Sequence, residues 1–272
     1  MRIGKISIVG RLLKAFGKKI VFLSEYDELL EKRSLLRRFT KIEEIAQESS
    51  DPELCRFLLA HAKKSHSQEL QDLIALYFTN QKLGYFVEFG ATDGFELSNT
   101  YLLEKEYGWS GILAEPARVW HKDLFANRSC HISVECVYSV SGEKIHFSEV
   151  QNKTLSTISA FGNLDLHSQE RLHSETYIVD TISLVDLLQK FNAPKTIDFL
   201  SVDTEGSEFE LLRDFRFDLF KFKFICIEHN FTSNEVRIDE LLSQNGYIRI
   251  LSKSSDFDAW FVHPDVWKEF LG

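Results

Sequence analysis

The chain has 272 residues, 44% hydrophobic and 27% charged, which is the composition of an ordinary folded protein that is long enough to bury a core. Its net charge of −9 argues against a protein built around broad contacts with nucleic-acid phosphates, because such contacts need a basic surface. The charge is uneven: residues 1–41 hold eleven Lys and Arg against four acids, about +7, so residues 42–272 carry about −16.

Residues 1–64 are predicted to form a helical N-terminal region. Apolar and basic side chains mix over residues 1–23, which fits a basic amphipathic helix on an anionic membrane surface, or a helix that packs on the main domain or a partner subunit. Residues 27–38, 41–47 and 52–63 have apolar positions at three- and four-residue spacing, which predicts helices.

No apolar run reaches the roughly 18 residues that a membrane-spanning helix needs. The four cysteines show no paired spacing, so we expect them to be reduced. These features predict a cytoplasmic protein. Peripheral contact with the inner membrane surface and a homo-oligomer contact are the two open roles for the basic N-terminus.

From Gly84 onward, short apolar runs alternate with amphipathic segments, which indicates a parallel sheet with crossover helices. The predicted strands are 85–89, 111–114, 132–137, 199–202, 224–227, 247–251 and 259–262. The predicted helices are 99–107, 120–125, 183–191, 208–213 and 234–245. A short polar link joins the last two strands, so we expect an antiparallel hairpin there. The sequence thus predicts an α/β domain over residues 65–272, with a Rossmann-like sheet of seven mostly parallel strands.

Ligands of open α/β sheets bind outside the carboxyl ends of the strands, so the residues just after each apolar run are the candidates for function. Five such segments follow predicted strands: Glu88–Gly94, Glu115–Pro116, Val137–Ser139, Asp203–Gly206 and Glu228–Asn230. Residues 151–176, polar and rich in Ser and His, form the longest segment without clear periodicity. We expect this long segment to have a functional role.

The first segment contains Gly90 and Gly94, which allow a tight turn and a close approach of the backbone to a ligand. It is not the dinucleotide fingerprint G-x-G-x-x-G, because the third glycine is missing and two acids, Glu88 and Asp93, would repel a pyrophosphate. Such acids can hold the ammonium and hydroxyl groups of S-adenosylmethionine. A nucleotide-dependent oxidoreductase and a non-catalytic Rossmann-like module that binds a partner stay open as alternatives.

The second segment begins with Glu115, 25 residues after Gly90. A carboxylate at this place can accept hydrogen bonds from both hydroxyls of an adenosine ribose.

Several motifs occur together in this chain: Phe86–Gly94, Asn99–Thr100, Gly111–Pro116 and Phe199–Glu208, with Ser67–Asp72 before them and Asp258–Val262 after them. In this combination the chain resembles the FkbM family of methyltransferases over about residues 65–263. The resemblance implies the seven-stranded class I methyltransferase fold, S-adenosylmethionine as donor, and O-methylation of a sugar, glycan or related small metabolite.

The resemblance also assigns roles by position. It implies that Glu88, Gly90, Asp93 and Gly94 hold the methionine part of the donor, that Glu115 holds the ribose, and that Val137–Ser139 border the adenine. Four further motif residues are expected at the donor site: Asn99, Thr100, Pro116 and Asp203.

Removal of the acceptor's proton is the remaining chemical problem, because a sugar hydroxyl is too weak an acid to ionise unaided near neutral pH. Asp203, Glu228 and Asn230, with His229 as an alternative ligand, resemble the ligand arrangement of cation-dependent O-methyltransferases and predict a Mg²⁺ or Mn²⁺ site. Without a metal, His229 or Glu205 is the predicted general base. We expect a small-molecule or glycan acceptor, bound with help from the N-terminal region and residues 151–176, and no nucleic-acid partner.

Overall fold

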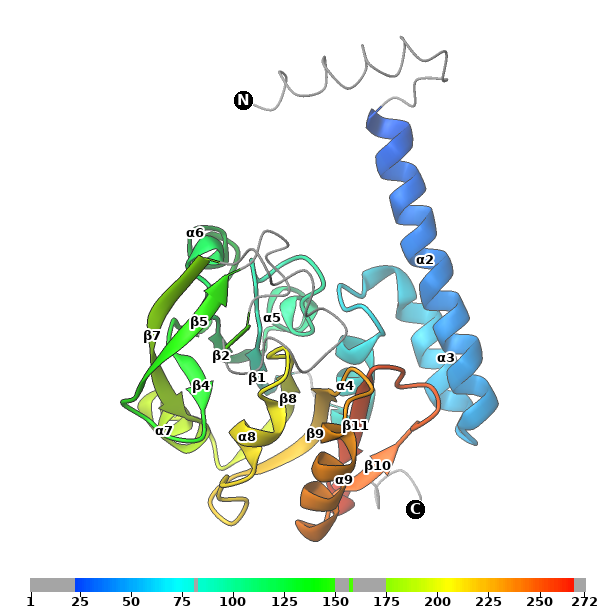
Figure 1. Ribbon diagram of the computed structural model, residues 1–272. Helices are drawn as coiled ribbons and strands as arrows, with labels where there is room; N and C mark the ends of the chain where they lie inside the picture. Colours follow the sequence, from blue (N-terminus) through cyan, green and yellow to red (C-terminus); the bar gives the residue numbers. More distant parts are fainter. Residues whose placement is uncertain (1–22, 81–82, 150–156, 159–174, 267–272) are drawn as a thin grey trace. The chain divides into compact units, whose positions relative to one another are not determined.

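The computed structural model describes residues 23–80, 83–149, 157–158 and 175–266 of the chain (Figure 1). It contains two compact units, residues 1–40 and 41–272. The described part of the first unit is the beginning of helix α2 (Leu23–Glu48), where Leu29, Leu36 and Phe39 are exposed. Residues 1–22, which hold nearly all of the predicted basic amphipathic segment, lie outside the described residues. Among the helices that are described, none is long and apolar enough to cross a bilayer.

The second unit begins with helical segments. Residues 27–38 and 41–47, predicted as two helices, belong to the single helix α2. Helix α3 (Pro52–His61) starts at Asp51, whose carboxylate accepts hydrogen bonds from the N–H groups of Glu53 and Leu54 at 2.9 and 3.3 Å. A 3-10 turn (Ala62–Lys64) and helix α4 (Gln71–Thr79) follow. Residues 41–64 are therefore in the same unit as the sheet.

A seven-stranded sheet forms the centre of the second unit, with the strand order β10-β11-β9-β8-β1-β2-β3. Its strands are β1 (Tyr85–Phe89), β2 (Ser110–Ala114), β3 (His131–Ser133), β8 (Thr196–Val202), β9 (Lys221–Glu228), β10 (Ile248–Ile250) and β11 (Asp258–Val262). Strands β3, β2, β1, β8 and β9 are parallel, whereas β11 pairs antiparallel with both β9 and β10. The predicted fold and its antiparallel C-terminal hairpin are confirmed.

Side chains alternate between the two faces of this sheet because successive residues of a strand point to opposite sides. One face, which includes Val87, Leu200 and Ile225, forms a buried core with α7 (Leu184–Lys190), α8 (Glu208–Leu212) and α9 (Asn234–Gln244). On the other face the ring of Phe224 stacks on Phe199 and on Phe78 of α4, with centroids 5.2 and 6.1 Å apart. Helices on both faces leave the strand ends as the place for a site.

The strand predicted over residues 132–137 is wrong, because this stretch divides between two sheets. β3 ends at Ser133, whose hydroxyl donates to Glu135 at 2.9 Å and accepts from the Glu135 N–H at 3.4 Å, so the chain turns there. The chain then enters β4 (Cys136–Tyr138), which belongs to a separate four-stranded sheet of order β4-β7-β5-β6.

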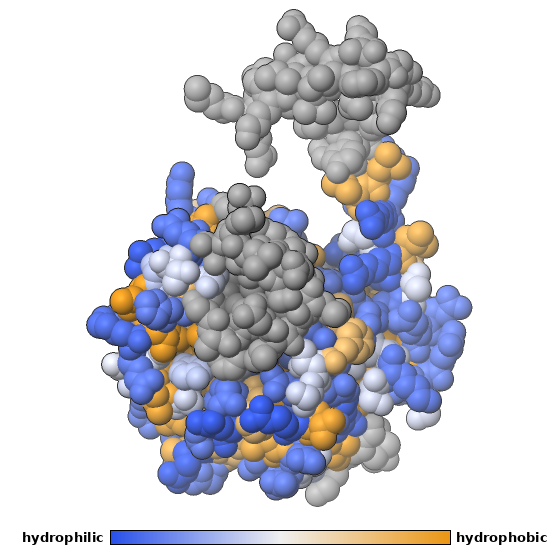
Figure 2. All heavy atoms as spheres, viewed as in Figure 1, coloured by the Kyte–Doolittle hydropathy of each residue, from blue (hydrophilic) through white to orange (hydrophobic). Residues whose placement is uncertain are grey.

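The other strands of the second sheet are β5 (Lys144–Glu149), β6 (Thr157–Ile158) and β7 (Glu175–Ser183). Apolar residues of this sheet, with Phe147 and Val179 among them, form a core of their own against Ala117 and Trp120 at the start of α6 (Arg118–Asn127). The segment predicted as a long functional loop, 151–176, thus contributes β6 and the start of β7. Its remaining residues lie outside the described part. On the face seen in Figure 2, hydrophilic side chains predominate, with apolar side chains scattered among them.

Candidate active site

A cavity of about 680 Å³ lies at the carboxyl ends of β1, β2, β8 and β9, where sequence analysis placed the ligand. This volume is within the range of small-molecule and cofactor sites. Of the eleven residues predicted to bind the donor, eight line the cavity: Glu88, Gly90, Asp93, Asn99, Glu115, Pro116, Val137 and Asp203. Gly94, Thr100 and Ser139 do not line it.

Gly90, at the end of β1, lies directly against the backbone at the end of β8. Its φ of +73° favours glycine, and a β-carbon at this position would lie 1.9 Å from the carbonyl oxygen of Asp203. Its N–H donates to the carbonyl of Ala114, at the end of β2, at 3.2 Å. The glycine therefore allows three strand ends to converge around the cavity.

Glu115 is held in place by two backbone hydrogen bonds. Its Oε2 accepts from the Thr92 N–H and its Oε1 from the Ala117 N–H, both at 2.8 Å. Burial raises the pKa of Glu115 to about 7, the nearby acids Asp203 and Glu149 add to the shift, and the two N–H groups oppose it. Because a carboxylate oxygen has two lone pairs, each oxygen can still accept a further hydrogen bond.

The carboxylate of Glu88 holds the loop that follows β1. It accepts hydrogen bonds from the Ser98 hydroxyl at 3.0 Å, the Asn99 N–H at 2.7 Å and the Thr100 hydroxyl, and Arg128 lies 3.7 Å away. Thr100 thus acts on the site through Glu88. The methionine-binding role that the sequence predicts for Glu88 stays a prediction.

Asn99 and Asp93 differ in how their polar atoms are used. The Asn99 amide donates to the Ser201 hydroxyl at 2.9 Å, whereas its Oδ1 is buried without a hydrogen-bond partner among the described residues. Asp93 accepts from the N–H groups of Phe95 and Glu96, both at 2.9 Å, and so closes the turn. Asn99 therefore keeps a buried acceptor without a partner among the described residues, in a side chain that lines the cavity.

An apolar wall beside Glu115 was missed by sequence analysis. Trp120, Phe147 and Ile158 line the cavity next to Val137, and the latter two come from the second sheet. Alternation of apolar and polar residues over 144–149 was the available signal for a strand there. One of the two pairing partners of that strand, β7, however, lies more than 25 residues further along the chain.

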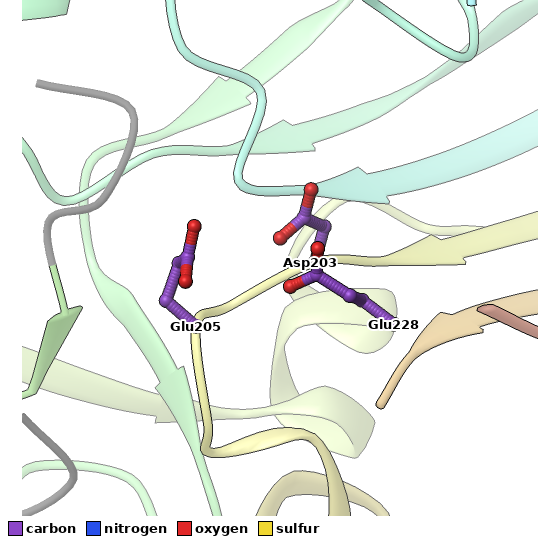
Figure 3. A group of neighbouring side chains, drawn as sticks. All are labelled: Asp203, Glu205 and Glu228. Atoms are coloured by element: carbon purple, nitrogen blue, oxygen red, sulfur yellow. The ribbon is translucent and has the colours of Figure 1, made fainter. Parts of the chain in front are cut away.

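Asp203, Glu205 and Glu228 form the acidic cluster of the cavity (Figure 3). One carboxylate oxygen from each lies within 4.8 Å of the other two. Glu205, in the left-handed region at φ +58°, comes from the loop after β8, and Glu228 ends β9. Glu228 Oε2 is buried without a hydrogen-bond partner among the described residues.

The carboxylates of the acidic cluster lie close together and are partly shielded from water, so their negative charges repel one another. Burial raises the pKa of Asp203 to about 7; a hydrogen bond from the Glu228 carboxyl opposes this shift, and Asp258 adds to it. Burial, followed by the charges of Asp203 and Glu205, raises the pKa of Glu228 far above its usual range. Asp203 is itself exposed to water in the cavity, which weakens the effect of burial on its pKa. The cluster therefore binds protons or cations readily near neutral pH.

His229 lies outside the large cavity, in a smaller pocket next to it. It is 3% exposed, its Nδ1 accepts from the Phe231 N–H at 3.1 Å, and its Nε2 lies 3.0 Å from the Asp258 carbonyl oxygen. In these contacts Nδ1 acts as the acceptor and Nε2 as the donor, so both ring nitrogens are used within the protein. The geometry thus disfavours the predicted general base, since no lone pair of the ring faces the cavity. Asn230, the predicted third metal ligand, does line the cavity.

The sheet order, the antiparallel last strands and a ligand cavity at the strand ends define the class I methyltransferase fold. The Methyltransferase FkbM domain matches residues 88–249, more than half of the chain. The chain therefore belongs to the FkbM methyltransferase family, as the sequence motifs predicted.

Similarity to solved structures is distant. The structure of "Methyltransferase FkbM" from Methylobacillus flagellatus KT is 12% identical, with a TM-score of 0.44, and the match covers 84% of this chain and 60% of that chain. A fibrillarin/Nop5p complex gives 10% identity and a TM-score of 0.33, over 67% of this chain and 73% of that chain. No curated protein matches the sequence.

Proposed function

We propose that the protein is an S-adenosylmethionine-dependent O-methyltransferase that acts on a hydroxyl of a sugar, glycan or related small metabolite. The anchored carboxylate of Glu115 carries this proposal. Two backbone N–H groups orient this carboxylate at the end of β2. Each of its oxygens keeps one lone pair, so the two oxygens can accept hydrogen bonds from the two hydroxyls of a ribose. Family membership supports methyl transfer as the reaction.

The bound donor would supply an electrophilic methyl group on a sulfonium. Asn99 Oδ1 is available for its ammonium group, and the apolar wall of Trp120, Phe147 and Ile158 for its adenine. In the transfer, an oxygen lone pair of the acceptor forms the new C–O bond, the S–C bond breaks, and its electron pair stays on sulfur as S-adenosylhomocysteine leaves. The hydroxyl proton needs an acceptor on the protein.

The acidic cluster is the proposed proton acceptor. A general base works best when its pKa is close to the working pH, and Asp203, with a pKa raised to about 7, meets this condition. Glu205 is the neighbouring carboxylate within the cluster. His229 has no comparable access to the cavity.

A divalent cation is a second candidate for this step, and Glu228 Oε2 is the observation that favours it. A buried carboxylate oxygen without a partner is costly, and a cation such as Mg²⁺ or Mn²⁺ would satisfy it. Asp203, Glu205 and Glu228 would hold the ion, and the predicted ligand Asn230 also lines the cavity. A bound cation would lower the pKa of the acceptor hydroxyl and orient it.

Calorimetric titration with S-adenosylmethionine and S-adenosylhomocysteine tests the donor site directly. We expect binding of both, and Glu115→Ala should weaken it about 10- to 100-fold, because hydrogen bonds to a charged group contribute about 1.5–3 kcal/mol. Glu240→Ala, at an exposed position of α9, is the matched control. No heat with either compound would favour the non-catalytic module, and tight binding of NAD would favour the oxidoreductase.

Removal of metal ions by a chelator distinguishes the carboxylate base from the divalent cation as the group that assists loss of the hydroxyl proton. After treatment with EDTA, methyl transfer from labelled donor should fall and return with Mg²⁺ or Mn²⁺ if a cation takes part. Binding of Mn²⁺ followed by electron paramagnetic resonance, with Glu228→Gln as the variant, gives a readout that does not depend on activity. Full activity after chelation would reject the cation and leave the carboxylate base.

Contacts of the N-terminal region stay proposals as well. The basic residues of 1–22 would favour an anionic membrane surface or a second copy of the chain. Flotation with anionic and neutral vesicles, and sedimentation at several protein concentrations, would distinguish the two.

A further inference from the structure

The cavity wall is strongly acidic. Eight of its residues are carboxylic acids: Glu88, Asp93, Glu96, Glu115, Asp203, Glu205, Glu228 and Asp258. Lys, Arg and His are missing from the described residues that line it. Arg128 contacts Glu88, but it does so from outside the cavity. Low-dielectric walls that carry charges of one sign focus the field inside a cavity, so this one attracts positive charge and repels negative charge.

Several polar donors on the cavity wall are already used within the protein. The amide of Gln71 donates to Asp258 at 2.8 Å, that of Asn99 donates to Ser201 at 2.9 Å, and the Ser98 hydroxyl donates to Glu88 at 3.0 Å. The two buried atoms without partners at this wall, Glu228 Oε2 and Asn99 Oδ1, are both acceptors. A ligand that brings hydrogen-bond donors therefore suits this part of the wall.

Protonation lowers this negative charge but leaves part of it in place. Burial raises the pKa of Glu115, Asp203, Glu228 and Asp258, so these four groups carry less negative charge near pH 7 than ordinary carboxylates. Asp93 and Glu96 also line the cavity, and no Lys, Arg or His among the described lining residues offsets their charge. An anionic group on the acceptor would therefore meet negative charge in the cavity.

We propose that the methyl acceptor is a polyhydroxyl compound without phosphate, sulfate or carboxylate groups, and that an amine on it strengthens binding. Hydroxyl and ammonium groups supply the hydrogen-bond donors that Glu228 Oε2 and Asn99 Oδ1 lack. An anionic group would instead be repelled by the carboxylates of the cavity wall. This inference rests on the proposed O-methyltransferase function. It narrows the acceptor to uncharged and amino sugars, aminocyclitols and similar polyols, and leaves out nucleotide sugars and sugar phosphates.

Fractionation by charge tests the proposal before the acceptor is known. A small-molecule extract of the cells that produce the protein is separated by ion exchange into anionic, neutral and cationic pools. Each pool is incubated with the protein and methyl-labelled S-adenosylmethionine. We expect label in the neutral or cationic pool, at least tenfold above the anionic one. Label mainly in the anionic pool would overturn the acceptor class and leave the methyltransferase function intact. No label in any pool, with the donor bound, would count against the proposed function itself.

A charge reversal at the cavity edge gives a second test. Glu96 lines the cavity and is exposed, so Glu96→Lys is expected to fold; Glu240→Lys on α9 is the matched control. For the labelled acceptor and its phosphorylated derivative, the ratio of kcat/KM values should shift about tenfold toward the phosphate in Glu96→Lys and stay constant in the control. An equal ratio in both variants would contradict electrostatic exclusion.

Discussion

The α-carbon of Gly90 lies against the carbonyl oxygen of Asp203, so that a β-carbon at residue 90 would approach this oxygen to 1.9 Å. The contact joins the end of β1 to the end of β8. The residues proposed to bind the methyl donor follow β1, and two members of the acidic cluster, Asp203 and Glu205, follow β8. Any side chain at residue 90 has to separate the two.

Gly90→Ala should therefore destabilise the protein and weaken donor binding. Gly142→Ala is the matched control, because Gly142 also has a positive φ, +79°, but a β-carbon there would have no neighbouring atom within 4 Å. Both variants carry the strain of a left-handed alanine, about 1–2 kcal/mol, and only Gly90→Ala adds an overpacking penalty of about 1–3 kcal/mol. Urea unfolding measures the difference. Equal losses in the two variants would show that the strand ends can separate at no cost.

Glu115 should make stability depend on pH. Its pKa rises from 4.5 to about 7 on folding, so between these values the folded state binds the proton more tightly than the unfolded state. The contribution to stability is present below pH 4.5 and is lost as the pH rises to 7. At 1.36 kcal/mol for each pKa unit, the loss reaches about 3 kcal/mol.

The variant Glu115→Gln isolates this effect, because it cannot titrate. From pH 5 to pH 8 we expect its free energy of unfolding to rise by up to about 3 kcal/mol relative to the native protein. Chemical unfolding of both proteins at several pH values, without ligand, gives the difference. A difference that stays constant over this range would mean that Glu115 is ionised throughout.

His229→Ala should act on folding rather than on catalysis. It leaves the Phe231 N–H and the Asp258 carbonyl without their partner, at a cost of about 1–3 kcal/mol each. We expect a lower Tm and an unchanged shape of the pH profile of kcat. A variant of native stability that loses one limb of the pH profile would restore His229 as the general base.

Glu228→Gln should reduce turnover with little effect on donor affinity. The substitution keeps the size of the side chain but removes a titratable carboxyl group from the acidic cluster, whether that cluster accepts a proton or holds a cation. A positioned proton acceptor contributes roughly 10²–10⁴-fold to rate, so a loss of at least 100-fold is expected in single-turnover experiments. Glu235→Gln, on α9, serves as the control. Turnover within threefold of the native protein would exclude Glu228 from the reaction.

Local sequence patterns were sufficient to predict most strands of the seven-stranded sheet. The run Tyr85–Phe89 was predicted with the bounds that β1 has, because its apolar residues are followed at once by a glycine turn. The second sheet was not predicted, since β4 (Cys136–Tyr138) pairs with residues 181–183, a partner that no local pattern identifies.

The sequence predicted which residues lie at the strand ends, but it did not predict in which direction each side chain points. Glu115 and Asp203 line the cavity as expected, because parallel strands end at one edge of the sheet. His229, next to Glu228 in sequence, points elsewhere, since neighbouring residues at a strand end face opposite sides and its ring is held by Asp258 and Phe231. Such contacts depend on the tertiary structure.

The cavity has walls from two sheets that are not hydrogen-bonded to each other within the described residues. Gly90 and Glu115 belong to the seven-stranded sheet, whereas Phe147 and Ile158 belong to the four-stranded one. The spacing between these walls is set by side-chain packing, by the short link from β3 to β4 and by the hydrogen bonds of Arg118 to Tyr177 and Ile178. Substitutions in the small core around Val179 are therefore expected to change the width of the cavity without contacting a bound ligand.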